Sequence, residues 1–384
     1  MKYYIIAGEA SGDLHGSNLM RGLKQVDTDP RFRYFGGDFM QEQGGELVMH
    51  YRHGAFMGIW EVVKNLGTIS RNMKLCKSDI QQWQPDVVIL IDYAGFNLKI
   101  AEFVKKLNIP VFYYISPKVW VWKESRVKKI KKLVDRMFVI FPFEVDFYKK
   151  HNYQSFFAGN PLIDAIEEKL PVLPDEKLFR QQNNLPENPI IALVPGSRKQ
   201  EIVLILPEML KAVERFPHYQ IIIAGAPSMD EAYYQPLLQN KKIPVLFGQT
   251  YALLKNAKAA VVTSGTATLE TAILNVPQVV CYKAGNITYQ IGRHIVKVKF
   301  FSLVNIIMNR EVVKELLQTD LYNRIAAELE KLLHNESYRS KMLDDYKELK
   351  SICGGSGASR RVAQMILTEL TGIKNNINEQ TIHN

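Results

Sequence analysis

The sequence predicts an α/β protein of two domains, each built on a parallel sheet that is covered by helices. Apolar runs of strand length recur along the chain with helical patterns between them, which is typical of parallel strands joined by crossover helices. This alternation starts again after a connector that contains Pro171 and Pro174 and the polar run 175–188. The 384 residues, of which 47% are hydrophobic, are enough for two domains that each bury a core.

The overall charge limits the kinds of partner. The 49 Lys and Arg residues against 39 Asp and Glu give a net charge of +10, which suits nucleic acid, an anionic membrane surface or phosphorylated substrates. Cys76, Cys281 and Cys353 are far apart and predict reduced thiols in a reducing compartment. No apolar run approaches the ~18 residues of a membrane-spanning helix, so we expect any membrane contact to be peripheral.

Four strands are predicted in the first half of the chain, at Tyr3–Ala7, Val87–Ile91, Val111–Ile115 and Met137–Ile140. The first apolar run is too short for a signal peptide and fits a first strand better. The turn that follows it, residues 8–16, contains three glycines but does not match the GxGxxG fingerprint of dinucleotide-binding proteins. Its polar side chains would lie at the mouth of the sheet, where α/β proteins bind ligands: Glu9, Asp13 and His15. Alternatively, Ser11 and Asp13 only cap a helix that starts near Leu14.

Residues 56–75 combine a helical stripe with extra bulky apolar groups. The stripe has the spacing of 3 and 4 residues that one helix face requires, and it comprises Ile59, Val62, Leu66, Ile69 and Met73. It is widened by Phe56, Met57, Trp60 and Val63, and lysines and arginines flank it. The pattern alone slightly favours an ordinary core helix. The alternative is a segment that docks on a membrane surface.

Asp92 follows the strand Val87–Ile91 and is therefore predicted at the carboxyl edge of the sheet, close to the first glycine turn. A carboxylate there can act as a general base, or it can simply cap a turn. Further along, residues 116–135 combine Trp120 and Trp122 with a run of lysines. No nucleic-acid-binding motif accompanies them, so an anionic lipid surface or a solvated helix face explains them better.

Two turns in the second half predict an anion site. Gly196, Ser197 and Arg198 follow a strand and precede a helix, where an arginine is disfavoured by the helix dipole unless it holds an anion. Ser264, Gly265 and Thr266 likewise lie between the strand 259–262 and a helix 266–274. The backbone N–H groups of such turns bind phosphate. Glu270 would then accept hydrogen bonds from sugar hydroxyls. A phosphate-binding turn and a sugar-binding acid together predict a nucleotide. Ordinary helix capping is the alternative.

The remaining stretch is predicted to be largely helical. Residues 305–318 predict a polar turn followed by an amphipathic helix, in which Asn305 either binds the ligand or caps the helix. A charged helix is expected over Ile325–Leu349 with a break near Asn335. Gly354–Gly357 predicts a hinge, Ala358–Leu370 a last helix, and residues 374–384 a frayed tail. No cluster of His, Cys and acidic residues has metal-ligand spacing, so catalysis is expected to need no metal.

Six motifs, in order along nearly the whole chain, resemble the lipid-A-disaccharide synthase family: GEASGD (8–13), IDYAGFN (91–97), SPKVWVWK (116–123), PGSR (195–198), SGTATLE (264–270) and NREVVKELLQ (309–318). The resemblance implies a GT-B fold, in which two Rossmann-like domains face each other across a cleft and the last helix crosses back to the first domain. It divides the chain into an acceptor and membrane-docking domain (1–165), a UDP-sugar domain (166–353) and a returning helix with its tail (354–384).

The resemblance also implies a reaction. The family transfers a diacylated glucosamine from UDP to a diacylglucosamine 1-phosphate, with inversion, at the inner face of the cytoplasmic membrane. By this resemblance the UDP site comprises Gly196, Ser197, Arg198, Ser264, Gly265, Thr266, Glu270 and Asn305. The stripe within 56–73 becomes a membrane-docking segment, and no cofactor, metal or nucleic acid is required. A homodimer with an exchanged last helix is compatible with the hinge.

Asp92 is the first candidate for the general base under this resemblance, followed by Glu9 and His15. Related sequences often carry a second acid where this chain has Gly95. If that second acid is the family's base, Asp92 is not its equivalent. Two other functions remain open: another UDP-sugar enzyme on the same fold, such as a UDP-N-acetylglucosamine 2-epimerase or a different lipid-linked transferase, and a non-catalytic basic protein that binds membranes or nucleic acid.

Overall fold

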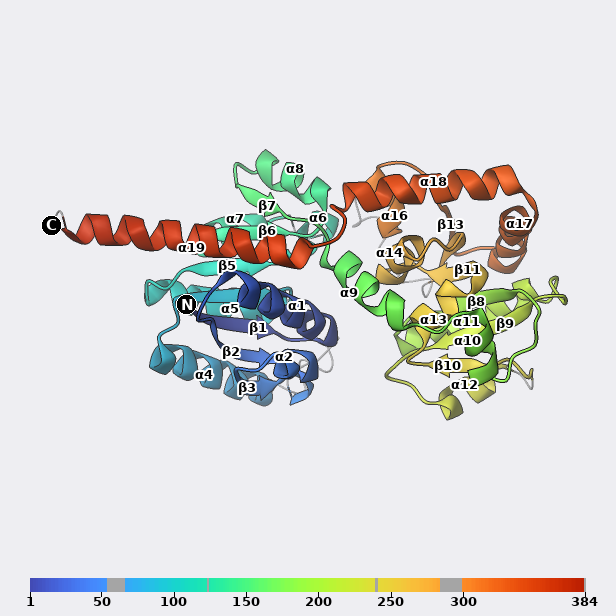
Figure 1. Cartoon of the computed structure of the whole chain (residues 1–384), viewed down its shortest axis with the longest axis horizontal. Coiled ribbons are helices and arrows are strands. Elements are labelled where there is room, and N and C mark those ends of the chain that lie inside the picture. The colour runs from blue at the N-terminus through green and yellow to red at the C-terminus, as the bar shows by residue number, and fades with distance from the viewer. Residues whose placement is uncertain (54–65, 123, 239–240, 284–298, 383–384) are drawn as a thin grey trace. The chain divides into compact units, whose positions relative to one another are not determined.

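The computed structural model describes residues 1–53, 66–122, 124–238, 241–283 and 299–382. The chain divides into two compact units. Unit 1 comprises Met1–Asp164 together with Cys353–Asn384, and unit 2 comprises Ala165–Ile352. Figure 1 shows one parallel sheet in each unit, with the last helix running along unit 1 although it ends the chain. The two helix-covered parallel sheets predicted from the sequence are confirmed.

Unit 1 contains a seven-stranded parallel sheet in the order β3-β2-β1-β4-β5-β6-β7. The strands are β1 (Lys2–Ala7), β2 (Arg31–Gly36), β3 (Glu46–His50), β4 (Val87–Ile91), β5 (Val111–Tyr114), β6 (Arg136–Val139) and β7 (Ser155–Phe157). The four predicted strands are present to within one residue at each end. The sequence analysis missed β2, β3 and β7, which are short or carry charged residues and so lack a continuous apolar run.

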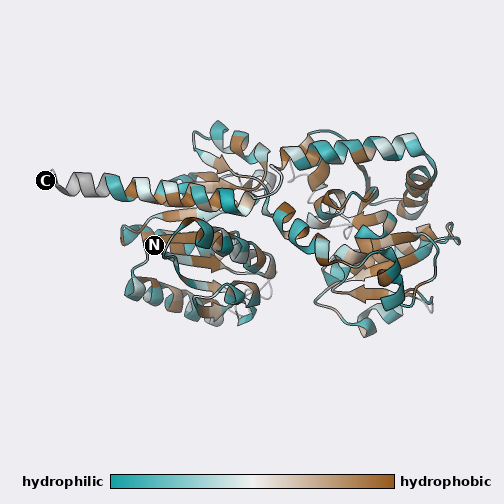
Figure 2. Cartoon of the chain, in the orientation of Figure 1, coloured by the Kyte–Doolittle hydropathy of each residue, from teal (hydrophilic) through white to brown (hydrophobic). Residues whose placement is uncertain are grey.

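Helices cover both faces of this sheet, and Figure 2 shows hydrophobic strands between helices of mixed hydropathy. The helices are α1 (Ala10–Val26), α2 (Asp38–Glu42), α4 (Leu66–Trp83), α5 (Ala94–Lys106), α6 (Val119–Trp122), α7 (Arg126–Leu133), α8 (Pro142–Lys150) and α19 (Ala358–Ile382), with a 3-10 turn at Tyr51–His53. Helix α9 (Pro161–Lys169) begins in unit 1 and ends in unit 2. One core contains Tyr4, Val88 and Tyr113. The other contains Tyr3, Ile89 and Phe112, so successive residues of a strand alternate between two buried faces.

The last helix is anchored firmly in unit 1. Asp164 accepts hydrogen bonds from the N–H groups of Gly357 (2.6 Å), Ala358 (3.2 Å) and Ser359 (2.7 Å), which caps the start of α19. A Cβ atom at Gly22 of α1 would lie 2.5 Å from the carbonyl oxygen of Ser359, so this glycine allows the two helices to pack closely. The helix runs to Ile382, so it is longer than the predicted Ala358–Leu370 and includes most of the tail, residues 374–384, that was predicted to be frayed.

Unit 2 contains a six-stranded parallel sheet in the order β10-β9-β8-β11-β12-β13. Its strands are β8 (Ile190–Val194), β9 (Gln220–Gly225), β10 (Val245–Phe247), β11 (Ala257–Thr263), β12 (Gln278–Tyr282) and β13 (Lys314–Leu317). The helices are α10 (Glu176–Gln182), α11 (Lys199–Val213), α12 (Glu231–Leu238), α13 (Thr250–Lys255), α14 (Thr266–Ile273), α16 (Leu303–Met308), α17 (Leu321–His334) and α18 (Glu336–Ile352), with a 3-10 turn at Leu170–Val172.

The segment 305–318 corrects a prediction. An amphipathic helix was expected after a polar turn, but a short helix, α16, comes first and the strand β13 follows. Residues 314–317 pair in parallel with residues 279–282 of β12 at the edge of the sheet. The free edge of β12 therefore determines the structure of a segment whose own pattern also fits a helix, because β-structure depends strongly on tertiary context.

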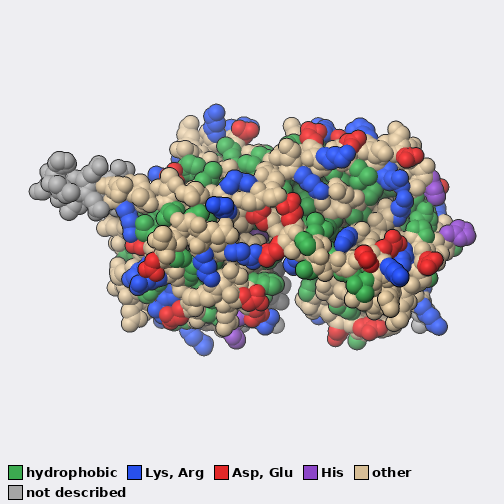
Figure 3. All heavy atoms as spheres, viewed as in Figure 1, with side chains coloured by type: hydrophobic (Ala, Val, Ile, Leu, Met, Phe, Trp, Pro, Cys, Tyr) green, Lys and Arg blue, Asp and Glu red, His purple; other side chains and the backbone are tan. Residues whose placement is uncertain are grey.

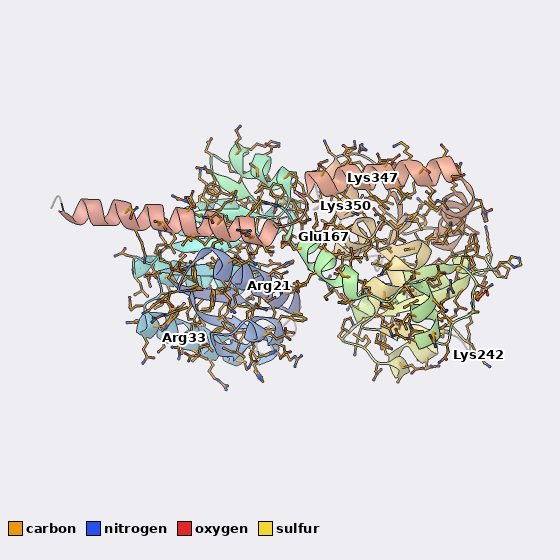
Figure 4. The ribbon with its side chains drawn as sticks, in the orientation of Figure 1. Arg21, Arg33, Glu167, Lys242, Lys347 and Lys350 are labelled. Carbon is orange, nitrogen blue, oxygen red and sulfur yellow. The ribbon has the colours of Figure 1, made fainter. Side chains whose placement is uncertain are left out.

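The charged helices of unit 2 follow the sequence more closely. The predicted break near Asn335 is confirmed, since α17 ends at His334 and α18 begins at Glu336. Lys350 of α18 and Glu167 of α9 point toward one another (Figure 4). Burial lowers the pKa of Lys350, and the charge of Glu167 opposes that change.

The three cysteines are buried and unpaired.

The visible surface shows mixed charges. On the face drawn in Figure 3, Lys and Arg side chains are interspersed with Asp and Glu side chains over both units. Across the ranges that the structure describes, every helix is too short or too polar to cross a bilayer.

Candidate nucleotide and acid-base sites

Both sheets have a switch point at which the strand order reverses. In unit 1 it lies between β1 and β4, and in unit 2 between β8 and β11. Ligands of doubly wound sheets bind at the carboxyl ends of the strands at such points, because the helices that follow leave the sheet on opposite faces. In unit 2, the turn after β8 and the turn after β11 lie at the switch point. In unit 1, Gly8 follows β1 and Asp92 follows β4.

A cavity of about 370 Å³ lies at the switch point of unit 2. Its lining comes from the turns that follow β8, β9, β10 and β11. The lining residues that the site uses are Gly196, Ser197, Ser264, Gly265, Thr266, Glu270 and Tyr251. The structure thus brings both predicted anion-binding turns and the predicted sugar-binding acid to one cavity within a single unit.

The β8–α11 turn contributes Gly196 and Ser197 to the wall of this cavity. Gly196 has a φ of +100°, and a Cβ atom there would lie 2.9 Å from Glu201 Oε2. Arg198 is the N-cap residue of α11, and its own side chain does not cap the helix. The guanidinium is 71% exposed and contacts Glu201 at 3.3 Å. An exposed ion pair contributes little stability, so the arginine can turn to an anion at small cost.

The β11–α14 turn presents a second helix N-terminus. Gly265 has a φ of +151° and is the N-cap residue of α14, where no side chain accepts a hydrogen bond from the first turn. Ser264 Oγ donates to the carbonyl oxygen of Phe301 at 2.8 Å, and Thr266 is exposed. The unsatisfied N–H groups of a helix start, together with its dipole, favour a bound phosphate.

Glu270 lies in the same cavity, one turn into α14. Tyr251 Oη donates to Glu270 Oε1 at 2.8 Å, and Lys169 Nζ lies 5.4 Å from the centre of the Tyr251 ring. Burial raises the pKa of Glu270, while the Tyr251 hydrogen bond and the charge of Lys169 oppose this rise. One oxygen of the carboxylate is thus held by Tyr251, which orients the other. Tyr251 was not predicted as a site residue; it is the second residue of α13, the helix that follows β10.

Asn305 does not belong to this site, which corrects the prediction. Its side chain is completely buried. The amide nitrogen donates to Val313 O and Glu315 Oε1, both at 2.8 Å, and the amide oxygen accepts from the N–H groups of Val312 (2.8 Å) and Val313 (3.0 Å). With every donor and acceptor occupied, Asn305 joins α16 to β13 and has no group left for a ligand.

In unit 1 the first turn is shorter than predicted. Helix α1 begins at Ala10, not near Leu14, and Glu9 is its N-cap residue. Asp13 therefore lies inside α1 and caps α2 instead, accepting from the N–H groups of Gly37 (2.7 Å), Phe39 (3.0 Å) and Met40 (3.1 Å). Asp13 is a structural residue, whereas Glu9 remains at the carboxyl edge of the sheet.

His15 lies within α1 and carries a buried ring nitrogen. Its Nδ1 atom has no hydrogen-bond partner among the described residues. Burial lowers the pKa of His15 to about 4, which keeps the imidazole neutral near neutral pH. A neutral imidazole of such low basicity is a weak proton acceptor.

Asp92 lies on strained backbone. Asp92 and Tyr93 both have left-handed φ values, +42° and +44°. The Asn97 amide donates to the carbonyl oxygens of Ile91 (3.1 Å) and Asp92 (2.9 Å), and Tyr113 Oη also donates to Asp92 O. Burial raises the pKa of Asp92, and the ammonium group of Lys118 and the N–H of Tyr93 oppose that change. Strain that neighbours hold in place, together with a raised pKa, is typical of functional carboxylates.

The apolar stripe is only partly described. Phe56, Met57, Ile59, Trp60, Val62 and Val63 lie outside the described residues. Leu66 begins α4 and is 57% exposed. Ile69 lines a small apolar crevice beside Gly8 and Tyr93, and Met73 packs against the core. Within the ranges that are described, no group of three or more His, Cys, Asp or Glu residues could hold a metal ion.

The solved structures to which this chain is similar define its class. They include a UDP-GlcNAc 2-epimerase from Methanocaldococcus jannaschii in complex with UDP-GlcNAc and UDP (TM-score 0.67, 16% identity, 96% of this chain and 100% of that one). They also include the glycotransferase of kitacinnamycin (TM-score 0.63, 14% identity, 96% and 99%). At these identities the likeness concerns the fold, which is that of the GT-B class.

The sequence relatives define the family. A family model described as lipid-A-disaccharide synthetase matches residues 3–366. A lipid-A-disaccharide synthase of Geobacter sulfurreducens is 37% identical over 373 residues, covering 95% of this chain and 96% of the relative. One from Coxiella burnetii is 37% identical over 367 residues, with 94% and 96% covered. The chain belongs to the lipid-A-disaccharide synthetase family and is a glycosyltransferase.

Proposed function

We propose that this chain transfers 2,3-diacylglucosamine from UDP to the C6 hydroxyl of 2,3-diacylglucosamine 1-phosphate. The acceptor oxygen attacks C1 of the donor sugar, the bond between C1 and the UDP oxygen breaks, and the configuration at C1 inverts. The products are the β-1′,6-linked disaccharide 1-phosphate and UDP. The observation that carries this proposal is the pair of glycine turns and Glu270 around one cavity at the switch point of unit 2.

UDP would be held by these turns. Gly196, Ser197, Arg198, Ser264, Gly265 and Thr266 would bind the diphosphate, and Glu270 would accept hydrogen bonds from the ribose hydroxyls. Negative charge grows on the diphosphate as it leaves, so donors fixed before the reaction stabilise the transition state more than the ground state. We expect these groups to replace a metal ion as the stabiliser of the leaving group, with no cofactor.

Asp92 would act as the general base. Its ionised carboxylate would take the proton of the acceptor hydroxyl as the new C–O bond forms, on the side of the sugar opposite UDP. The raised pKa of Asp92 supports this role, because a stronger base accepts the proton more readily. Glu9 and His15 are the next candidates, and the low pKa of His15 places it last.

The acyl chains of both substrates imply work at a membrane surface. We propose peripheral contact with the anionic inner face of the cytoplasmic membrane through the stripe that ends at Leu66, Ile69 and Met73. The large exposed fraction of Leu66 supports this contact. Flotation with vesicles of anionic phospholipid tests it: Leu66→Ser together with Trp60→Ser should reduce vesicle binding, and unchanged binding would reject the stripe. A homodimer is compatible with this arrangement.

A transfer assay separates this proposal from the epimerase alternative. The purified chain is mixed in detergent with UDP-2,3-diacylglucosamine, with or without 2,3-diacylglucosamine 1-phosphate, and with or without EDTA. We expect UDP and a tetra-acylated disaccharide phosphate in equal amounts only when the acceptor is present, and unchanged rates in EDTA. An isomerised UDP-sugar in the absence of acceptor would favour the epimerase, and loss of activity in EDTA would reject the metal-free mechanism.

A further inference from the structure

Glu144 is a deeply buried carboxyl group that the proposed mechanism does not use. It belongs to the first turn of α8 and is 1% exposed. Its Oε2 atom accepts hydrogen bonds from the N–H groups of Ile140 (3.3 Å) and Phe141 (3.1 Å). Glu144 therefore fixes the turn between β6 and α8, which lies at the carboxyl edge of the sheet beside the turn that follows β5.

The segment that follows β5, Ser116–Trp120, rests on the start of α8. Ser116 Oγ and Tyr148 Oη share a hydrogen bond of 2.6 Å. The rings of Trp120 and Phe143 meet edge to face, with centroids 4.9 Å apart, and Phe143 stacks on Phe141 at 5.5 Å. This segment therefore packs against the turn that Glu144 holds in place.

Lys118 lies on this segment, and its side chain is exposed. Its charge acts on both carboxyl groups, because it opposes the rise that burial causes in the pKa of Asp92 and of Glu144. The position of the Lys118 ammonium relative to Asp92 depends on the backbone from Ser116 to Trp120, which α8 supports. A displacement of α8 would therefore change the electrostatic environment of Asp92 without touching it.

We infer that Glu144 is a positioning residue, which holds the Ser116–Trp120 segment on α8 so that Lys118 stays beside Asp92. This inference rests on the proposed role of Asp92 as the general base. Glu144 itself contacts neither substrate in this account.

The charges around the two carboxyl groups support this arrangement. Burial raises the pKa of Glu144 to about 8, so the group is largely neutral at pH 7 and leaves the Lys118 charge to act on Asp92. The titratable groups that face Glu144 are Lys118 and Tyr148. Those that face Asp92 are Lys118 and Tyr113. Of these, only Lys118 is positively charged, and it favours the ionised form of Asp92.

The test compares Glu144→Ala, Glu144→Gln and Lys118→Met in the transfer assay, each with its pH profile of kcat, its Tm and its Kd for UDP. Glu144→Ala should lower kcat at pH 7 about 10-fold and move the acid limb of the profile upward by roughly 0.5–1 pH unit. Lys118→Met should move the limb in the same direction. Glu144→Gln should restore most of the activity, because the amide oxygen can accept both N–H groups. UDP binding should be unchanged in all three.

Asp135→Asn is the matched control. Asp135 accepts from Val111 N–H at 2.8 Å and Lys105 Nζ at 2.6 Å at the opposite edge of the sheet. This variant should lower Tm without moving the acid limb. If Glu144→Ala lowers activity only in proportion to Tm and the limb stays, Glu144 is merely structural and the inference is wrong. An unmoved limb in Lys118→Met overturns it even if Glu144→Ala fails to fold. An acid limb that persists in Asp92→Asn would instead reject Asp92 as the base.

Discussion

The backbone N–H of Asp92 donates a hydrogen bond to the carbonyl oxygen of Ile115 over 3.3 Å, and both residues adopt left-handed backbone conformations. Ile115 has a φ of +65°, which is unfavourable for a β-branched residue. These two residues directly follow the neighbouring strands β4 and β5, so their bond joins the turn after β4 to the segment that carries Lys118. Two strained positions thus hold one carboxylate at the switch point of unit 1.

Asp92→Asn should stabilise the protein at neutral pH. Burial raises the pKa of Asp92 in the folded state above its ordinary value, so the folded state binds the proton more tightly than the unfolded state. That contribution to stability is complete below the ordinary pKa and is lost as the pH rises through the folded pKa. Asparagine carries no charge and tolerates the left-handed backbone, so its Tm should exceed that of the wild type at pH 7. The difference should shrink in acid, and a lower Tm at pH 7 would contradict the burial argument.

Arg198→Ala should weaken UDP binding by about 1.5–3 kcal/mol, or roughly 10- to 150-fold in Kd, since a charge-assisted hydrogen bond to phosphate is lost. Isothermal titration at two salt concentrations measures this. Glu201→Gln is the matched control, because it removes the negative charge that lies 3.3 Å from Arg198 and keeps the guanidinium. Its affinity should stay equal or rise. Equal Kd values for Arg198→Ala and the wild type would exclude Arg198 from the diphosphate site.

Glu270→Gln should weaken UDP more than a nucleotide without ribose hydroxyls. The wild type should prefer UDP over 2′,3′-dideoxy-UDP, and the variant should lose most of that preference. Competition binding with both nucleotides measures the ratio of the two Kd values. If the variant keeps the full preference, Glu270 does not contact the ribose.

Tyr251→Phe should reduce UDP affinity about 2- to 12-fold, the effect of one hydrogen bond of 0.5–1.5 kcal/mol. The loss should grow as the pH falls, because Tyr251 helps to keep the pKa of Glu270 down and its removal lets Glu270 take up a proton at higher pH. Titrations at two pH values check this. A pH-independent loss would show that Tyr251 acts by packing alone.

Asp164→Ala should lower the free energy of unfolding by about 1–2 kcal/mol, the usual effect of removing an N-cap. The variant leaves the N–H groups at the start of α19 without their acceptor. Urea denaturation measures the change, and Asp164→Asn, which keeps one acceptor oxygen, should lose less. Equal stability of Asp164→Ala and wild type would mean that this cap does not hold α19.

The sequence predicted those features that depend on short segments. The strands with continuous apolar runs and the positions of the two glycine turns of unit 2, after β8 and after β11, were predicted because each signal lies within about ten residues. The helix start at Ala10 was missed, since Gly12 and Gly16 resemble a loop. In the structure Gly12 lets α1 approach the sheet, since a Cβ atom there would lie 3.2 Å from the Cβ of Ala7, and Gly16 lets α1 approach Met40 of α2.

Other features depend on contacts with residues far away in the chain, which local sequence patterns do not reveal. Segment 314–317 became a strand because β12 offered an edge, and Asn305 is saturated by groups that lie seven to ten residues further on. The pair of Tyr251 and Glu270 joins turns after two different strands. Such contacts are set by the order of the strands in the sheet, which local patterns do not determine.

The most direct measurement is kcat for Asp92→Asn and wild type, with both acylated substrates saturating and the Kd for UDP measured on the same preparations. The account predicts a kcat at least 100-fold lower in the variant, as expected when a general base is lost, with Kd for UDP unchanged within about twofold. Near-normal turnover by a folded, UDP-binding Asp92→Asn would contradict it, and the base would then be sought at Glu9.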